Sequence, residues 1–247
     1  MPEFRLKIAG CAAAVRGEFE STPHYFRNYL TEEEPRILLT VSAGDRVFEQ
    51  RALLEEALQE GIRPRVFPEP YLERAAIQRK MAEALFDWDI LMLHGSTVAV
   101  DGEAYLFTAK CGTGKSTHTR LWRQIFGDRA VMVNDDKPFL AVAGKGVIAW
   151  GSPWSGKHGL DTNMAVPLKG ICVLERGREN RICRAEPEQM LPMLLHQGYC
   201  PQTPAKEPRF RALVETLCRQ VPLWQMQCNM DPEAARISHA AMSGKDK

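Results

Sequence analysis

The sequence predicts an α/β fold, with one large α/β domain and a small N-terminal α+β lobe. Short apolar runs typical of strands crowd residues 90–174, whereas apolar residues with helical spacing dominate 187–242. Three prolines at 64, 68 and 70 separate these segments from the shorter elements before them. Hydrophobic residues make up 45% of the chain and charged residues 26%, which is typical of a globular protein with a buried core.

Residues 1–70 are expected to form the lobe. The apolar run 8–15 predicts a first strand; the alternative, a signal peptide, is disfavoured because the run is short and built of small residues. Residues 36–41 predict a second strand. Residues 47–60 predict a helix, because Leu54 and Leu58 lie four apart and Gly61 follows as a stop signal.

Residues 71–247 are expected to form the α/β domain. A helix is predicted over 72–86, where every fourth residue from 77 to 85 is apolar. Asp101-Gly102 between two apolar runs predicts a β-hairpin of 90–100 and 103–109. Further strands are expected at 130–133, 139–142, 147–150, 170–174 and 223–228, and further helices at 117–126, 187–196, 210–220 and 232–242.

The segment AKCGTGKS, residues 109–116, matches the phosphate-binding loop GxxxxGK[ST] except that Ala109 replaces the first glycine. A predicted strand precedes it and a predicted helix follows, as the motif requires. Glycines allow the tight turn in which backbone N–H groups face phosphate oxygens. Lys115 is expected at the β- and γ-phosphates and Ser116 at Mg²⁺. The residues expected to bind a nucleotide are Cys111, Gly112, Thr113, Gly114, Lys115, Ser116 and Thr117.

Two adjacent carboxylates, Asp135 and Asp136, follow the predicted strand 130–133. Ligands of parallel sheets bind at the carboxyl ends of strands, where both side chains can turn toward one site. Magnesium takes one or two carboxylates with phosphate oxygens, and phosphoryl transfer uses a carboxylate as proton acceptor. The pair therefore indicates a metal and proton-transfer site; the alternative is a solvated turn before Lys137-Pro138.

Two further residues are candidates for catalysis. His94 interrupts an apolar strand just before the hairpin that leads to the phosphate loop, so it either faces the phosphates or is a core residue. Lys157 lies in the loop 151–159, after a predicted strand, and is expected to neutralise transition-state charge or hold an anionic acceptor. The alternative for that loop is an ordinary surface connection with Trp154 packed on the core.

In this order, these segments resemble HPr kinase/phosphorylase and ATP-dependent phosphoenolpyruvate carboxykinase, and most of all the bacterial HPr-kinase-related proteins. The matching segments are 94–102, 111–122, 134–138, 154–157 and 167–171. The resemblance implies the carboxykinase-like P-loop fold, with a mixed central sheet and a β-hairpin before the phosphate loop. It implies that Asp136 is the proton acceptor, that Asp135 assists the metal and that His94 lies near the reacting phosphate. The two Asp roles could also be exchanged, because adjacent carboxylates titrate as a pair.

The expected function is therefore a kinase that uses ATP and Mg²⁺ to phosphorylate a hydroxyl of a small molecule or of a peptide or protein serine. The alternatives are a decarboxylating carboxykinase-type phosphotransferase and a non-catalytic nucleotide-binding regulator. The glycine-rich signature with Arg and Glu that follows the Asp pair in HPr kinases is not found, so the resemblance leaves the acceptor unnamed.

The remaining expectations concern partners and location. The net charge of +1 predicts neither nucleic-acid nor membrane binding. The seven cysteines form no CxxC pair and indicate free thiols in the cytoplasm. HPr kinases are hexameric, so the resemblance raises homo-oligomerisation as an expectation, although the sequence leaves the oligomeric state open.

Overall fold

The structure is a computed structural model that describes residues 2–59, 61, 63–142 and 144–244. The chain divides into two compact units, Met1–Leu85 and Phe86–Lys247. The boundary expected at residue 70 lies one helix earlier than this division. Among the described residues, no helix combines the length and the apolar character needed to span a bilayer.

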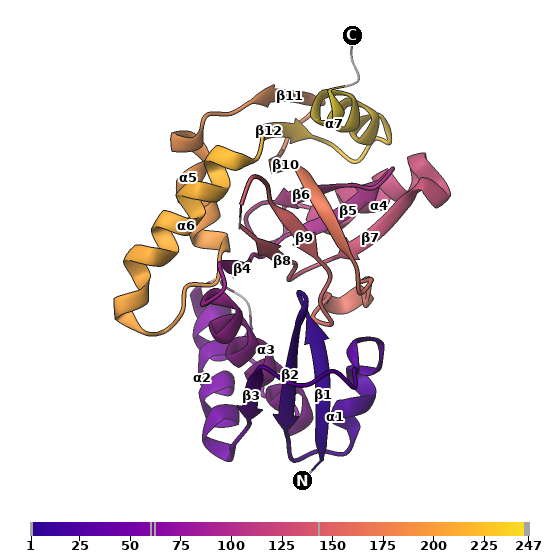
Figure 1. Cartoon of the computed structure of the whole chain (residues 1–247). Helices are drawn as coiled ribbons and strands as arrows, with labels where there is room; N and C mark the ends of the chain where they lie inside the picture. The colour runs from indigo at the N-terminus through magenta and orange to yellow at the C-terminus, as the bar shows by residue number, and fades with distance from the viewer. Residues whose placement is uncertain (1, 60, 62, 143, 245–247) are drawn as a thin grey trace. The chain divides into compact units, whose positions relative to one another are not determined.

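The first unit is a small α+β structure (Figure 1). Its described elements are β1 (Glu3–Ile8), β2 (Cys11–Arg16), α1 (Ser21–Tyr25), β3 (Ile37–Thr40), α2 (Ala43–Gln59) and α3 (Glu69–Phe86). The described strands form a three-stranded sheet in the order β1-β2-β3, in which β1 and β2 are antiparallel and β2 and β3 parallel. The helix predicted over 47–60 corresponds to α2, while its last residue, 60, lies outside the described residues.

The single strand predicted over residues 8–15 is wrong, because the chain reverses within it. Ala9 and Gly10 have φ angles of 49° and 78° and connect β1 to β2. Glycine adopts this left-handed conformation readily, so Gly10 permits a two-residue hairpin turn. Apolar and small residues continue without interruption on both sides of the turn, which explains why the sequence pattern resembles one strand.

Helix α3 belongs to the first unit because its charged side chains are bound there. The Arg79 guanidinium donates to Glu49 Oε1 at 2.5 Å and to Asp45 Oδ1 at 3.0 Å, both on α2. Glu73, which is fully buried, accepts a hydrogen bond of 2.6 Å from Thr22 Oγ1 in α1. These contacts, together with the buried apolar stripe predicted over 77–85, join α3 to the elements before it.

The second unit is a mixed α/β structure, and every strand and helix predicted after residue 90 has a counterpart in it. The strands are β4 (Ile90–Met92), β5 (Ser96–Val100), β6 (Glu103–Thr108), β7 (Ala130–Asn134), β8 (Phe139–Ala141), β9 (Ile148–Trp150), β10 (Ala165–Arg176), β11 (Arg181–Arg184) and β12 (Leu223–Cys228). The helices are α4 (Lys115–Phe126), α5 (Pro187–Gln197), α6 (Glu207–Gln220) and α7 (Glu233–Ser243). Only β11 has no counterpart among the predicted elements.

In the described part of this unit the strands form one nine-stranded mixed sheet in the order β4-β8-β9-β10-β6-β5-β7, with β12 beside β10 and β11 beside β12. Successive residues of β6 and β10 face opposite sides, so the sheet has a core on each face. Helices α5 and α6 cover one face, and α4 and α7 cover the other (Figure 1).

Strand β10 joins two parts of the sheet. Its first residues pair with β9 in antiparallel fashion, whereas its later residues pair in parallel with β6 on one side and β12 on the other. Because β6, β10 and β12 run in the same direction, their carboxyl ends lie at the same edge of the sheet. That edge is where ligands of such sheets bind.

The hairpin that precedes the phosphate loop forms as predicted. Strands β5 and β6 are antiparallel, and Asp101 and Gly102 have φ angles of 53° and 81°, as a type I′ turn requires. The strand predicted over 90–100 is interrupted, however, at residues 93–95. There the amide of His94 donates to Gln197 O at 2.8 Å and that of Gly95 to Asp136 O at 3.0 Å. These bonds take the backbone out of the sheet between β4 and β5.

Candidate functional site

The phosphate loop connects the carboxyl end of β6 to the first turn of α4, as the motif predicts. Gly112 and Gly114 have φ angles of 72° and 122°. A side chain at Gly112 would meet nothing within 4 Å, so backbone conformation rather than lack of space requires glycine there. Among the described non-glycine residues, positive φ occurs only at Ala9, Asp89 and Asp101. Ala109 therefore replaces the usual first glycine without backbone strain.

Asp135 is held by the hydroxyl of Ser96, which in turn contacts the hydroxyl of Thr119 on α4. The Ser96 hydroxyl on β5 donates to Asp135 Oδ1 at 2.5 Å and lies 2.7 Å from the Thr119 hydroxyl on α4. All three side chains are buried. The network fixes the orientation of the carboxylate at the end of β7, in the same cavity that Ser116 lines.

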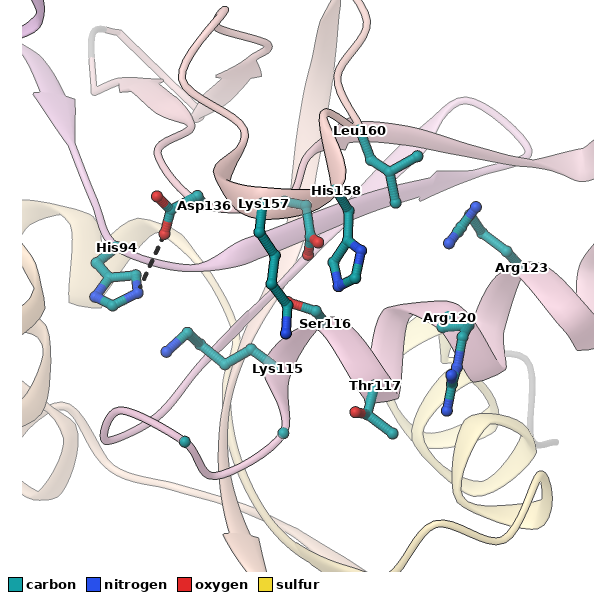
Figure 2. Close-up of a pocket in the computed structure, with 13 residues that line it drawn as sticks. His94, Lys115, Ser116, Thr117, Arg120, Arg123, Asp136, Lys157, His158 and Leu160 are labelled. Carbon is teal, nitrogen blue, oxygen red and sulfur yellow. Dashed lines mark ion pairs between the residues drawn. The ribbon is translucent and has the colours of Figure 1, made fainter. Parts of the chain in front are cut away.

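Asp136 and His94 contact each other, with Nε2 3.3 Å from Oδ1 (dashed line, Figure 2). Burial, and then the positive charges of Lys137 and Lys115, lower the pKa of His94 to about 2, so the ring is neutral. The contact is therefore not an ion pair. Burial is also the main reason why the pKa of Asp136 is raised above its ordinary value. The neighbouring carboxylate of Asp135 acts in the same direction, and Lys137 and Lys115 act against it.

Asn134, the last residue of β7, ties the Asp pair to the loop that follows β9. Its side-chain oxygen accepts hydrogen bonds from the amides of Asp136 at 2.8 Å and Lys137 at 2.6 Å. Its side-chain nitrogen donates to the carbonyls of Ser152 at 2.8 Å and Trp154 at 3.3 Å. No role was predicted for Asn134, although its position directly before the two aspartates indicates one.

The loop after β9 brings Lys157 and His158 into the site on a short 3-10 helix, Gly156–His158. In Figure 2 Lys157 extends toward Ser116 and Lys115. Trp154 is buried, as the alternative for this loop expected, so the loop both packs on the core and contributes polar groups to the cavity.

These groups surround one cavity of about 360 Å³ (Figure 2). Its lining residues are His94, Gly112, Gly114, Lys115, Ser116, Thr117, Arg120, Arg123, Asp135, Asp136, Lys157, His158 and Leu160. Of the residues predicted for the site, Cys111 and Thr113 do not line this cavity; Cys111 is exposed, and Thr113 lines an adjoining one. Arg123 was not anticipated, although its spacing of three from Arg120 places both on one helix face.

The chemistry of the cavity suits a polyanion and a magnesium ion. Four cationic side chains, Lys115, Arg120, Arg123 and Lys157, line it together with two carboxylates. Among the described residues, no group of three or more His, Cys, Asp or Glu side chains is arranged to hold a metal by itself. A metal here would therefore need oxygen ligands from the phosphates in addition to Ser116 and Asp135, which is how magnesium binds in nucleotide sites.

No family model and no curated protein matches the sequence. Among solved structures, the HPr(Ser) kinase/phosphatase from Coxiella burnetii superposes with a TM-score of 0.36 at 12% identity, over 63% of this chain and 99% of that one. At this weak level of similarity the residues of the cavity, and not the comparison, decide what the site can do.

Proposed function

We propose that the protein is an ATP- and magnesium-dependent kinase that phosphorylates a hydroxyl group of a small molecule or of a peptide or protein serine. One observation carries the proposal: a phosphate loop with Lys115 and an Asp pair with His94 line the same cavity. The loop binds phosphates and the pair supplies a metal ligand and a base, which are the parts that phosphoryl transfer needs.

Asp135 and Ser116 hold the magnesium ion in this proposal. The hydrogen bond from Ser96 supports the assignment, because it fixes the Asp135 carboxylate in one orientation. A magnesium ion held by Asp135 and Ser116 would neutralise part of the charge of the bound phosphates. The amides of the phosphate loop and the Lys115 ammonium hold the same phosphates.

Asp136 accepts the proton of the acceptor hydroxyl. Its raised pKa makes it a stronger base than an ordinary aspartate, and the neutral ring of His94 orients it. The hydroxyl oxygen attacks the γ-phosphorus, the bond from phosphorus to the β,γ-bridging oxygen breaks, and ADP leaves. Lys115 and Lys157 stabilise the negative charge that spreads over the transferred group.

Nucleotide binding is tested by titrating the protein with Mg-ATP in a calorimeter. Lys115→Ala removes a charge-assisted contact worth about 1.5–3 kcal/mol, so affinity should fall at least about tenfold. Lys110→Ala is the matched control, because Lys110 is an exposed lysine of the same loop that does not line the cavity. Equal affinity of both variants for Mg-ATP would contradict the assignment of the phosphate site.

Transfer is tested with γ-³²P-labelled ATP and pools of metabolites and serine peptides. Asp136→Asn should keep Mg-ATP affinity but lose about 10²–10⁴-fold in transfer, the usual contribution of a general base. Asp128→Asn, at an exposed aspartate outside the cavity, should transfer normally. A wild-type protein that binds Mg-ATP and labels no acceptor would leave only the nucleotide-binding regulator.

A further inference from the structure

A second cavity, of about 460 Å³, adjoins the phosphate cavity. The two share Gly112, Gly114 and Thr117, so the phosphate loop and the first turn of α4 form their common wall. The second cavity also opens between the carboxyl ends of β10 and β12, at Arg176 and Cys228. It therefore lies at the same edge of the parallel strands as the phosphate loop itself.

The lining of the second cavity is more apolar than that of the first. Leu121 on α4 and Leu174 on β10 are buried side chains that contribute apolar surface. Met230, after β12, also lines the cavity and leaves 76% of its surface exposed. Arg176 adds a cation and donates to Gly112 O at 2.5 Å, which links the cavity to the phosphate loop. A flat apolar group next to a phosphate matches this combination.

One polar atom of a side chain that lines the second cavity has no hydrogen-bond partner in the described structure. His118 is 2% exposed, lines the cavity, and its Nδ1 makes no hydrogen bond within the described structure. A buried polar atom of this kind costs free energy unless a ligand or water completes it. Burial lowers the pKa of His118 to about 4, so the ring is neutral near pH 7.

The contacts of His118 Nε2 determine which tautomers the ring can adopt. His118 Nε2 lies 3.0 Å from Ser238 Oγ and 3.2 Å from Trp122 Nε1, and Trp122 Nε1 also donates to Ser238 Oγ at 2.9 Å. Because these contacts fit either neutral tautomer, Nδ1 can donate or accept. The edge of adenine carries ring nitrogens that accept and an amino group that donates, so it can complete Nδ1 in either tautomer.

We infer that the second cavity binds the purine base of the nucleotide donor, with His118 Nδ1 hydrogen-bonded to the edge of the base. The inference rests on the proposed function, since it needs phosphates on the loop. The phosphate chain then passes Thr117, one of the residues common to both cavities, and the base rests against Leu121, Leu174 and Met230. The cavity of about 460 Å³ has room for a two-ring base, whose second ring buries more apolar surface than a pyrimidine does.

The experiment compares magnesium complexes of ATP, CTP and inorganic tripolyphosphate by calorimetry on the full-length protein. ATP should bind at least about fivefold more tightly than CTP and tripolyphosphate, because apolar burial of a second ring adds affinity. If none of the three binds, the proposed function fails. If all three bind with equal affinity, the phosphate site stands and the base site is overturned.

Two variants locate the base. Met230→Ala should weaken ATP binding about three- to tenfold through lost apolar contact and leave tripolyphosphate binding unchanged. Val131→Ala is the control, because Val131 is an exposed apolar side chain outside both cavities. An ATP affinity equal in Met230→Ala and Val131→Ala would overturn the placement of the base.

The role of His118 is tested by a pair of substitutions. His118→Gln removes the hydrogen-bonding atom at the Nδ1 position and should weaken ATP binding about fivefold relative to tripolyphosphate, the usual effect of one hydrogen bond. His118→Asn keeps a side-chain amide near the Nδ1 position and should restore part of that difference. Melting temperatures report on the fold of both variants. Folded variants with the wild-type ratio of ATP to tripolyphosphate affinity would overturn the contact.

Discussion

The buried environment of Asp136 changes the strength of its carboxylate as a base. A carboxyl group with its ordinary pKa is a weak base, because it is fully ionised and holds protons poorly at neutral pH. Burial of Asp136 raises its pKa and so strengthens it as a proton acceptor. The neutral ring of His94 is 3.3 Å away and adds no positive charge that would reverse this effect.

The raised pKa of Asp136 predicts the pH dependence of transfer. The carboxylate is the active form, and it is lost as the pH falls through a folded-state pKa above the ordinary value of 3.8. Turnover should therefore decline on the acidic side of neutrality, with one proton responsible. His94 stays neutral over this range, because its pKa of about 2 lies far below it.

The measurement is a pH profile of turnover for the wild type and for Asp136→Asn. The residual activity of Asp136→Asn should lose the acidic limb, while a control aspartate variant, Asp128→Asn, should keep it. A limb that persists unchanged in Asp136→Asn would assign the titration to another group and contradict the role of Asp136 as base.

At the scale of elements, the loop after β9 is positioned by backbone contacts as much as by side chains. The Gly151 amide donates to Met164 O at 3.0 Å, and the Thr162 amide donates to Val133 O at 3.2 Å. These bonds and the side chain of Asn134 hold the loop against the end of β7. The position of Lys157 in the cavity depends on this arrangement, so the loop links sheet packing to the site.

Gly151 is the position where this arrangement tolerates no side chain. A Cβ atom there would lie 1.8 Å from Thr162 O and 2.8 Å from Val133 O, both backbone atoms that cannot move alone. Gly151→Ala should destabilise the protein by about 1–3 kcal/mol or more, the usual cost of overpacking, with a lower melting temperature. Gly146→Ala is the matched control, because a Cβ there meets nothing within 4 Å. Equal melting temperatures of Gly151→Ala and Gly146→Ala would contradict the close approach of Gly151 to Thr162 and Val133.

At the scale of the whole molecule, the positive and negative charges nearly cancel, but they are distributed unevenly over the protein. The chain carries 32 basic and 31 acidic residues, yet four cations and two carboxylates line the phosphate cavity. Ion pairs elsewhere, such as Arg79 with Glu49 in the first unit, neutralise charges in place. The net charge of the chain therefore does not indicate the ligand, whereas the charges that line the cavity indicate a polyanion.

The seven cysteines allow a test that covers the whole chain. Burial raises the thiol pKa of Cys11, Cys172, Cys200, Cys218 and Cys228 and makes them slow to react. The exposed cysteines are Cys111, in the phosphate loop, and Cys183, on β11. Limited alkylation followed by mass spectrometry should label these two first.

Bound nucleotide should protect only one of the exposed cysteines. Mg-ATP on the phosphate loop should slow the labelling of Cys111 severalfold and leave Cys183, the internal control, unchanged. Equal labelling of Cys111 with and without Mg-ATP would count against a nucleotide at this loop.

The sequence by itself determined the features that depend on neighbours along the chain. The hairpin at Asp101-Gly102 and the glycines of the phosphate loop follow from backbone angles that few other residues adopt. The helical stripe of α3 follows from periodicity. The Asp pair was found for the same reason, because adjacent charges that follow an apolar strand form a local pattern.

Only the tertiary structure decided which distant segments meet. Asn134 reaches the loop at Ser152, Arg123 joins the phosphate cavity, and His118 lines a second cavity with Leu174 and Met230. Each of these depends on the register of paired strands or on packing between elements far apart in sequence. The hairpin turn at Ala9 and Gly10 and the break before β5 were missed because an apolar run does not reveal where its amides find partners. Hydrogen bonds to distant carbonyls set such breaks, and those partners are fixed only when the sheet has formed.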